Sequence, residues 1–396
     1  MLRVVLLVLL CVTSLSAGRA DTYVVLPFFN LTKSPNLDWI GESIAETMRE
    51  TLASKGVLVI DREDRSEVYR RLSLRPYVLL TRASVVQVAE NLDAHHVIYG
   101  HFELNPPEDA DSESLGTIKI TARILDLRRI RRGPEFTESG SLEELAWLQS
   151  HLAWQALQFL VPGAAPTERE FRRENTPVRL DAIENYVRGL LAPTPEQKHR
   201  FFTQAARLDP DYTQPCFQLG RLHFQRKDYR IAADWFQRVG ESHVHFREAK
   251  YFLGLSLYYM NDFEAAEQAF ELVAATVPLN EVFNNLAAAQ SRRGLPAAIE
   301  NFRRALEGDP GDPAYHFNLG YLLWKQGRFD EAAERFRDAL DREPSDQQAI
   351  LMLGRCLKKA GPRPSDPRSE GLERLKENYD ESAYWQLKAM LEPEKN

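Results

Sequence analysis

Histidine, aspartate and glutamate side chains are the residues of this sequence whose types could serve acid–base catalysis or hold a metal ion. Asp61, Glu63 and His95 are the set that an enzyme built on the amino-terminal half would have to bring into one pocket. His95 and His101 would share one face of a predicted strand, but about 20 Å of strand separates them, so they cannot bind one metal ion. Catalysis therefore depends on a fold that gathers the first three side chains.

The sequence carries no motif that would strengthen the enzymatic interpretation. It has no Gly-x-Ser-x-Gly turn, no phosphate-binding loop ending in Gly-Lys-Ser/Thr and no His-Glu-x-x-His zinc motif. His243 and His245 fall in a predicted turn between helices, and the acidic loop at 106–113 lacks the glycine and the distal glutamate of a calcium-binding loop. We therefore predict no catalytic residue, no cofactor and no metal ligand, and we expect a protein that is not an enzyme.

A repeat of about 34 residues organises residues 182–360. A leucine followed by glycine or alanine, a later alanine, a phenylalanine four residues on and a closing proline recur in register. The leucines are Leu219, Leu253, Leu286, Leu319 and Leu353, the alanines Ala232, Ala266, Ala298 and Ala332, the phenylalanines Phe236, Phe270, Phe302 and Phe336, and the prolines Pro210, Pro278, Pro310 and Pro344. This pattern resembles the tetratricopeptide repeat (TPR), in which each unit is a hairpin of two helices.

A single helical hairpin cannot bury its own apolar face, so hairpins of this kind must stack into a superhelix with a concave side. A degenerate first unit is expected at 182–211, followed by units at 213–246, 247–279, 280–312 and 313–346, and by a lone first helix from Gln347. The alternative is a plain helical bundle, whose loops would not be evenly spaced. We predict an all-α TPR solenoid of about five hairpins.

The resemblance to TPR proteins implies a partner-binding groove on the concave side, lined by fixed positions of each first helix. Aromatic side chains with a few cations there suit an apolar or helical peptide. Phe217 and Ala314 stand where relatives that bind a terminal carboxylate carry other residues, so such a ligand is disfavoured. The predicted groove residues are Phe217, Arg221, Phe224, Tyr251, Leu255, Tyr258, Tyr259, Asn284, Arg292, Phe317, Tyr321 and Trp324. About half of the aromatic ones are equally compatible with packing between helices.

Residues 21–163 have the pattern of an α/β domain. Strands are expected at 22–28 and 57–60, a helix from Asp38, an antiparallel pair at 95–104 and 116–127, a further strand at 135–139 and a final helix through Leu145 and Phe159. Apolar and polar residues alternate along 117–124, which is the period of a sheet with one solvated face. We predict a mixed sheet with flanking helices.

Two segments of this domain resemble a known family. Leu26, Pro27, Phe28 and Asn30 end the first strand, and Asp38, Gly41 and Glu42 begin the helix, as in the TolB amino-terminal-like domain and the related FlgO-type bacterial proteins. The resemblance covers about 120 residues. No β-propeller follows, so the role of TolB itself is not implied. Asn30-Leu31-Thr32 is also a glycosylation sequon, but in a bacterial protein the strand-end interpretation takes precedence.

Residues 1–20 have the features of a secretory signal peptide, with Arg3, an apolar run from Val4 to Leu10 and a cleavage site after Ala20. Leu10 precedes Cys11 where a lipidated cysteine needs a small residue, so lipidation is not expected. No other stretch is apolar for long enough to predict a membrane span. The expected location is outside the cytoplasm, in the bacterial periplasm.

The chain of 396 residues has a formal net charge of −7, and loss of residues 1–20 would make the charge about −9. A chain this acidic is a poor non-specific ligand of nucleic acid. The basic cluster at 128–132 is interpreted as a solvated hairpin turn, with contact to an anionic surface as the alternative. Cys216 and Cys356 lie in repeats too far apart to form a disulfide.

The predicted domains are a signal peptide (1–20), the α/β domain (21–163), a linker (164–181), the TPR array (182–360), a second linker (361–369) and a capping helix with a tail (370–396). Leu372, Leu375, Tyr379 and Trp385 would cover the last apolar face of the array. We expect a non-catalytic exported scaffold that binds protein or peptide partners and has the α/β domain as a second interaction module. The alternatives are an enzymatic α/β domain and a sensory domain that binds a small ligand.

Overall fold

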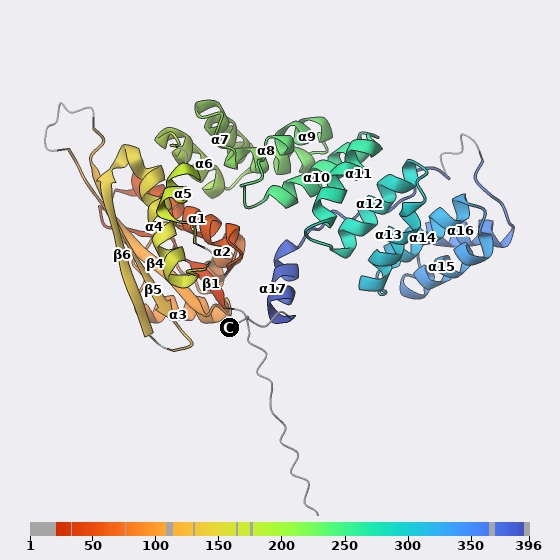
Figure 1. Ribbon diagram of the computed structural model, residues 1–396, viewed down its shortest axis with the longest axis horizontal. Coiled ribbons are helices and arrows are strands. Elements are labelled where there is room, and N and C mark those ends of the chain that lie inside the picture. The colour runs from red at the N-terminus through yellow and green to blue at the C-terminus, as the bar shows by residue number, and fades with distance from the viewer. Residues whose placement is uncertain are drawn as a thin grey trace, which may run out of the picture.

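The computed structural model describes residues 21–32, 34–75, 77–107, 114–129, 131–163, 165–174, 177–363 and 369–391. An α/β unit at the amino-terminal end is followed by a stack of helical hairpins (Figure 1). The predicted fold class, a mixed sheet with flanking helices followed by helical repeats, is confirmed. The predicted signal peptide and the acidic run Glu108, Asp109, Asp111 and Glu113 lie outside the described residues.

The sheet combines parallel and antiparallel strands in the order β3-β1-β4-β5-β6, with β2 beside β4. Parallel pairs join β1 to β3, β1 to β4 and β2 to β4, whereas β4, β5 and β6 form an antiparallel meander. The strands are β1 (Thr22–Val25), β2 (Phe29–Asn30), β3 (Leu58–Val59), β4 (His96–Asn105), β5 (Thr117–Asp126) and β6 (Arg131–Ser141).

Helices cover both faces of the parallel part of the sheet. They are α1 (Asp38–Ser54), α2 (Arg62–Arg71), α3 (Arg82–Asn91) and α4 (Leu145–Leu160). Successive residues of a strand point to opposite faces, so Val25 packs with α1 and α4 and its neighbour Val24 packs with α2 and α3. Ile118, Ile120 and Ala122 of β5 are buried against α4, as the alternation along 117–124 predicted.

The predicted strand-end motif, Leu26 to Asn30 with Asp38 to Glu42, forms the junction between β2 and α1. Gly41 has no room for a side chain, because a Cβ atom there would lie 2.0 Å from the carbonyl oxygen of Phe28. Asn30 is buried and donates its amide hydrogens to the Ser34 carbonyl at 2.8 Å and to Asp38 at 2.9 Å. These contacts occupy the amide of the predicted sequon inside the folded protein, which supports the structural interpretation of Asn30.

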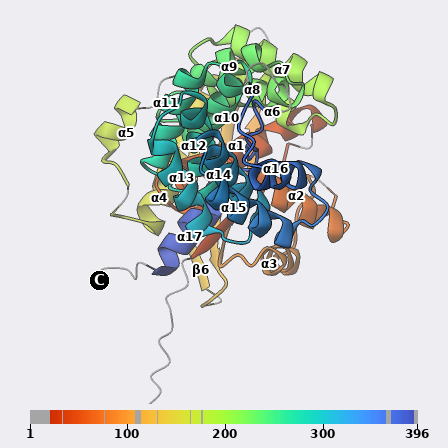
Figure 2. The same cartoon turned by 90° about the vertical axis from the view of Figure 1, so that its right-hand side faces the viewer.

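Five helical hairpins and one single helix form the repeat stack, which extends away from the sheet (Figures 1 and 2). The hairpins are α6 (Leu180–Leu191) with α7 (Pro195–Leu208), α8 (Gln214–Gln225) with α9 (Tyr229–Gln237), α10 (Phe246–Tyr259) with α11 (Phe263–Ala274), α12 (Asn280–Arg292) with α13 (Ala297–Gly308), and α14 (Pro313–Lys325) with α15 (Phe329–Arg342); α16 (Gln347–Leu357) follows.

The recurring glycine and phenylalanine hold the two helices of a hairpin together. A Cβ atom on Gly220 would lie 2.5 Å from the ring of Phe236, and one on Gly254 would lie 2.8 Å from the ring of Phe270. The ring therefore fills the space that the missing side chain leaves. The leucines that precede these glycines, Leu219, Leu253 and Leu319, are buried, whereas Leu353 before Gly354 is only partly buried. This contact explains why the small residue and the phenylalanine recur together.

The first hairpin packs directly on the α/β unit. Ile183, Tyr186 and Leu190 of α6 belong to the same hydrophobic core as Ile44 and Met48 of α1. The predicted linker at 164–181 contains a short helix, α5 (Glu168–Glu174), whose Phe171 is buried and packs against two tryptophans of α4. In the part of the chain that the structure describes, no helix is both long and apolar enough to cross a membrane.

Candidate functional site

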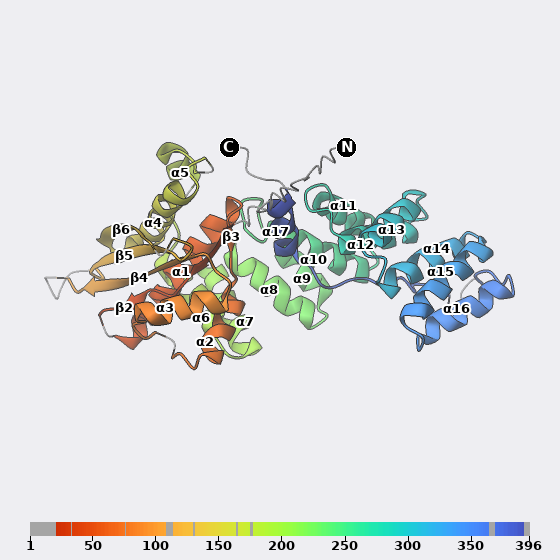
Figure 3. The same cartoon turned by 90° about the horizontal axis from the view of Figure 1, so that it is seen from below.

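The concave side of the repeat stack holds a segment of this same chain. Residues 369–380, the groove segment, run along the first helices α14, α12 and α10 and lead into α17 (Glu381–Leu391), which contacts β3 (Figures 1 and 3). Leu372, Leu375 and Tyr379 pack against the hydrophobic core of the repeats. The surface formed by α10, α12 and α14, here called the groove, is therefore a binding site for an extended polypeptide, occupied by residues 369–380.

Two asparagines of the groove bind the main chain of the segment. Asn318 accepts a hydrogen bond from the Arg374 N–H and donates one to the Arg374 carbonyl, both at 2.8 Å. Asn285 binds Lys376 in the same way, at 2.9 Å and 2.8 Å. An extended residue directs its N–H and C=O to the same side, so each asparagine amide replaces a neighbouring strand. Contacts of this kind do not depend on the side chains of the segment.

Two further residues complete this row of polar groups. Asn284 donates to the Arg374 carbonyl at 2.9 Å, and the Tyr251 hydroxyl donates to the Lys376 carbonyl at 2.7 Å. Asn284 accepts from Asn318 at 2.7 Å, and Tyr251 accepts from Asn285 at 2.8 Å; each bond joins two successive first helices. A buried polar group without a partner costs about 1–3 kcal/mol. The groove segment supplies partners to these asparagine and tyrosine side chains, which would otherwise have to bond to water.

Charged side chains of the segment meet opposite charges in the groove. Glu373 has a fully buried side chain near Arg292 and Lys325. Arg374 pairs with Asp346 at 2.6 Å and lies over the ring of Phe317 at 3.6 Å from its centroid. Burial alone would raise the pKa of the Asp346 carboxyl, but hydrogen bonds from Arg374 and from backbone amides lower that pKa below its usual range. The segment is therefore bound by charge as well as by its main chain.

Lys376 forms an ion pair with Asp312, and the Tyr259 hydroxyl donates to Glu377 at 2.7 Å. Tyr379 lies with its ring 4.9 Å from that of Tyr251. Burial raises the pKa of the Tyr251 hydroxyl well above its usual value, which keeps this donor protonated. Contacts thus continue along the whole length of the groove segment.

Some of the predicted groove residues contact the groove segment, and the others do not. Seven of the twelve contact the groove segment, and these are Tyr251, Tyr258, Tyr259, Asn284, Arg292, Phe317 and Tyr321. Trp324 is fully buried and donates from its indole to the Ala360 carbonyl at 2.8 Å. The other four contact neighbouring repeat residues: Phe217 stacks on His245, Arg221 pairs with Glu248, Phe224 packs on Phe252, and Leu255 is buried in the core. Binding of a separate partner by the twelve residues remains a prediction.

Several residues that contact the segment were absent from the predicted set. They are Asn285, Asn318, Lys325, Asp312 and Asp346. A signal for the asparagines does exist in the sequence, because Asn285 and Asn318 stand at the same place of successive repeats, directly before Leu286 and Leu319. A side-chain amide that recurs at a buried helix position indicates that it forms the same hydrogen bonds in successive repeats.

The predicted capping helix at 370–396 is wrong for its first part. Residues 370–380 are not helical, and the helix begins only at Glu381. The main chain from Arg374 to Lys376 forms hydrogen bonds with groove side chains, which a helix would have kept inside itself. The apolar residues Leu372, Leu375 and Tyr379 do cover the repeats, but they do so from an extended backbone. Residues 364–368 and 392–396 lie outside the described residues.

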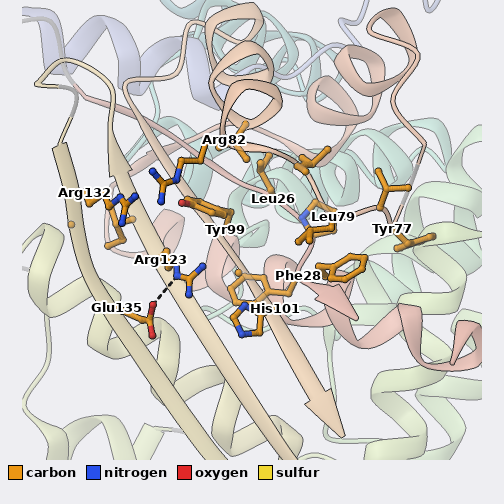
Figure 4. A pocket seen from close by; sticks show the side chains of 18 of the residues that line it. Leu26, Phe28, Tyr77, Leu79, Arg82, Tyr99, His101, Arg123, Arg132 and Glu135 are labelled. Atoms are coloured by element: carbon orange, nitrogen blue, oxygen red, sulfur yellow. Dashed lines mark hydrogen bonds and ion pairs between the residues drawn. The ribbon is translucent and has the colours of Figure 1, made fainter. Parts of the chain in front are cut away.

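A second hollow lies in the α/β unit, between the sheet and the segment that precedes α3 (Figure 4). It measures about 470 Å³ and is lined by Tyr99 and His101 of β4, by Phe28 from the segment between β1 and β2, and by exposed Leu79 from the loop. Arg123 reaches into it and is paired with Glu135 at 2.7 Å. The pKa of His101 is lowered by partial burial and by the charge of Arg123. The hollow combines an apolar floor with cations at its rim.

The residues of the enzymatic alternative do not meet. Asp61 accepts a hydrogen bond from Arg49 at 3.4 Å, Glu63 is exposed, and His95 hydrogen-bonds to Thr22. None of them lines the hollow of Figure 4. Among the described residues, no group of three or more His, Cys, Asp and Glu side chains could hold a metal ion. The three side chains therefore do not form one catalytic constellation.

Comparisons with known proteins agree with the repeat architecture. The tetratricopeptide repeat family model matches four overlapping windows, at 217–281, 251–313, 286–346 and 317–361. Solved structures similar to this chain include MamA from Desulfovibrio magneticus RS-1, a "41-end" form with 26% identity that covers 40% of this chain and 92% of that one at a TM-score of 0.37. YrrB, described as a TPR protein with an unusual peptide-binding site, has 18% identity over 48% of this chain and 91% of that one, at a TM-score of 0.35.

Both similarities have TM-scores below 0.5, so they carry no argument about function. No match was found among curated proteins. The family model, by contrast, covers the helices α8 to α16 whose recurring Leu-Gly, Ala and Phe contacts were described above. Residues 217–361 of this chain are tetratricopeptide repeats.

Proposed function

We propose that this protein is a non-catalytic scaffold whose TPR groove binds an extended segment of a partner protein. Asn318 pairs with both the N–H and the C=O of Arg374, and Asn285 pairs in the same way with Lys376, two residues further along the segment. This observation carries the proposal. A surface that binds a peptide through its main-chain N–H and C=O groups accepts many sequences, as sheet edges do when they bind peptides. The seven predicted groove residues that contact the segment and these two asparagines form the proposed site.

The location and the second module are parts of the same proposal. The signal-peptide pattern of residues 1–20 supports export, with the periplasm as the compartment. The resemblance of about 120 residues of the α/β unit to TolB-like domains supports a second interaction module. The core shared by α1 and α6 supports an α/β unit that holds the groove in a fixed position. Sequencing the amino terminus of the mature protein tests the export: a chain that retains residues 1–20 in the envelope fraction would contradict it.

The groove can be tested with a chain that is cut after folding. A factor Xa recognition sequence is placed within residues 364–368, between α16 and the groove segment, and the folded full-length chain is cleaved there. The groove segment is then held without a covalent link, and a fluorescent synthetic peptide of residues 369–391 can exchange with it. We expect fluorescence anisotropy to show saturable binding of the peptide, because the segment can form its contacts with the groove without a covalent link to α16.

N-methylated peptides separate main-chain binding from side-chain binding. Methylation of the Lys376 nitrogen removes the hydrogen bond to Asn285 without changing a side chain, and we expect affinity to fall at least about tenfold. Methylation of the Leu375 nitrogen is the matched control and should have a smaller effect. The proposal is refuted if the two methylated peptides bind with equal affinity. It is also refuted if native mass spectrometry shows that the cut segment dissociates from the groove but the synthetic peptide does not bind in its place.

A small-ligand function of the α/β unit is the second candidate, and the hollow of about 470 Å³ favours it. Its volume is in the range of small-molecule sites, and aromatic and cationic residues line it. A thermal-shift screen with anionic metabolites tests this candidate, because a ligand of the folded state raises the melting temperature. Tyr99 lines the hollow, so Tyr99→Ala is the decisive control. It should abolish the rise in melting temperature caused by a ligand that binds there.

A further inference from the structure

We propose that the groove contains a subsite for a glutamate side chain, and that its partners are extended segments carrying glutamate followed directly by arginine or lysine. This inference rests on the proposed function and adds the chemistry of the ligand. The residues that occupy the groove in the structure, Glu373 and Arg374, are the template for that chemistry. A partner segment must displace them, because both would require the same groups.

The glutamate subsite lies between α10, α12 and α14. The Ser291 hydroxyl donates to the Glu373 carboxylate at 3.1 Å, and the Tyr258 hydroxyl donates to its other oxygen at 3.4 Å. Lys325 Nζ lies 3.6 Å from one carboxylate oxygen, and Arg292 Nη1 lies 3.8 Å from the other. Three successive first helices thus direct donors and positive charge to a single buried point.

The subsite is polar although no solvent reaches its ligand. The Glu373 side chain is 0% exposed, and Tyr258 and Ser291 are buried as well. Burial and the Glu373 carboxylate raise the pKa of Tyr258 well above its usual value, so this hydroxyl stays a donor. A buried carboxylate with two cations and two hydroxyl donors is well compensated, whereas an apolar side chain would leave the two hydroxyls and the two cations without the carboxylate that they face. The subsite therefore selects for a carboxylate.

The positions beside the glutamate add selectivity. Arg374 lies between the Asp346 carboxylate and the face of the Phe317 ring, a place that suits a long cation. Gly371, two residues before the glutamate, has a φ of +68°, and a side chain there would meet Arg292 at 2.9 Å. The preferred segment thus has a glycine, an apolar residue that packs on the repeats as Leu372 does, a glutamate and a cation. The asparagines described above hold its main chain.

The reverse charge order is disfavoured by the same geometry. A segment with a cation at the first place and a carboxylate at the second would direct the cation at Arg292 and Lys325 and the carboxylate at Asp346. Like charges facing each other in a buried site oppose binding strongly. Affinity should therefore depend on the order of the two residues, at constant composition.

Three synthetic peptides of residues 369–391 test the inference on the cut full-length chain: the native sequence, Glu373→Gln, and a peptide in which Glu373 and Arg374 are exchanged. We expect Glu373→Gln to weaken binding at least about tenfold, and the exchanged peptide to weaken it further. Glu377→Gln is the matched control, since Glu377 is exposed and contacts only the rim residue Tyr259 among the groove residues. This control should bind within about twofold of the native peptide.

A second measurement avoids dependence on exchange. In the uncut chain, Glu373→Gln should speed hydrogen–deuterium exchange of the amides of Arg374 and Lys376 by a similar factor, whereas Glu377→Gln should leave it unchanged. If the native peptide binds but Glu373→Gln and the exchanged peptide bind equally well, the glutamate subsite is refuted while the proposed function stands. If the native peptide fails to bind although the cut segment dissociates, the proposed function itself is refuted.

Discussion

Asn284 and Asn318 donate hydrogen bonds to the same oxygen, the carbonyl of Arg374, at 2.9 Å and 2.8 Å. The two asparagines lie on successive first helices, α12 and α14, and they also bond to each other. One main-chain carbonyl of the groove segment is therefore bound by two repeat units at once. Stacking geometry and segment binding are coupled at this point, because a change in the spacing of α12 and α14 would break one of the two bonds.

Asn318→Ala should loosen the groove segment and destabilise the repeats. The substitution removes three hydrogen bonds of the Asn318 side chain and leaves the Arg374 N–H without its acceptor. We expect a loss of about 1–3 kcal/mol in the free energy of unfolding. Chemical denaturation measures this loss, and hydrogen–deuterium exchange should show faster exchange at Arg374 than in the native chain.

Asn301→Ala is the control for this prediction. Asn301 lies on α13, away from the groove, and donates a single hydrogen bond to Gln290 at 2.8 Å. It should change the exchange rate of the Arg374 amide little. If both variants accelerate exchange at Arg374 equally, general destabilisation and not the loss of the Asn318 pairing is responsible.

The repeat stack was predictable because its physical cause is local. Glycine at 220 and phenylalanine at 236 touch within one hairpin, so their spacing is visible in the sequence. The extended groove segment was not predictable in this way. Leu372, Leu375 and Tyr379 have spacings of three and four residues, which favour a helix. The amides of Asn285 and Asn318, distant in sequence, override that local preference with long-range hydrogen bonds.

The α/β unit shows the same division. The alternation along β5 predicted its buried face, because a strand repeats every two residues. Nothing local predicted that α1 would share a core with α6, since Met48 and Ile183 are far apart in the chain. The catalytic set of Asp61, Glu63 and His95 was not confirmed for a related reason: these residues were grouped by type, whereas the fold places Asp61 beside Arg49 and His95 beside Thr22.

The recurring glycines should differ in their tolerance of alanine. Gly220→Ala places a methyl group 2.5 Å from the buried ring of Phe236, which must move. We expect a loss of about 1–3 kcal/mol in the free energy of unfolding. Gly354 holds the equivalent place in α16, where no phenylalanine follows and a Cβ atom would meet no neighbouring atom within 4 Å. Gly354→Ala should instead stabilise by about 0.5–1 kcal/mol through helix propensity. Thermal denaturation of both variants checks the difference in sign.

Arg65 should be essential for the position of α2 on the sheet. It is 5% exposed, donates to the Val25 carbonyl at 2.9 Å and pairs with Glu42, which is 2% exposed. Arg65→Met leaves part of the Glu42 charge uncompensated, and we expect a loss of about 3 kcal/mol. Arg70→Met on the same helix removes only an exposed pair with Glu67 and should change stability by no more than about 0.5 kcal/mol. Similar losses in urea denaturation would contradict the role of Arg65.

Glu50 should make the stability of the protein fall as the pH rises through neutrality. It lies on α1, and its side chain is 17% exposed. Burial and the neighbouring Glu46 carboxylate raise the pKa of Glu50 to about 7, although Arg49 and His245 oppose the shift. Within the described residues, the Oε1 atom of Glu50 has no hydrogen-bond partner. A carboxylate in this position is therefore poorly compensated when it ionises.

The sign follows from the two protonation states. The folded protein holds the Glu50 proton up to a pH of about 7, whereas the unfolded chain releases it near 4.5. The stabilisation by the neutral form is therefore complete below about pH 4.5, declines as the pH rises and is lost above about pH 7. Glu50→Gln mimics the neutral form, so it should match the native chain at pH 5 and exceed its stability at pH 8 by about 1–3 kcal/mol.

Glu46→Gln provides the opposite sign at a neighbouring position. Burial would raise the pKa of Glu46, but Arg49 lowers it to about 2, so the ionised form stabilises the fold above about pH 4.5 and that stabilisation is lost as the pH falls through 2. Glu46→Gln should thus destabilise the protein at pH 8, where Glu50→Gln stabilises it. Urea denaturation of the three chains at pH 5 and pH 8 separates the two effects. A stability of Glu50→Gln that does not rise relative to the native chain between these pH values would show that Glu50 is already ionised at pH 5.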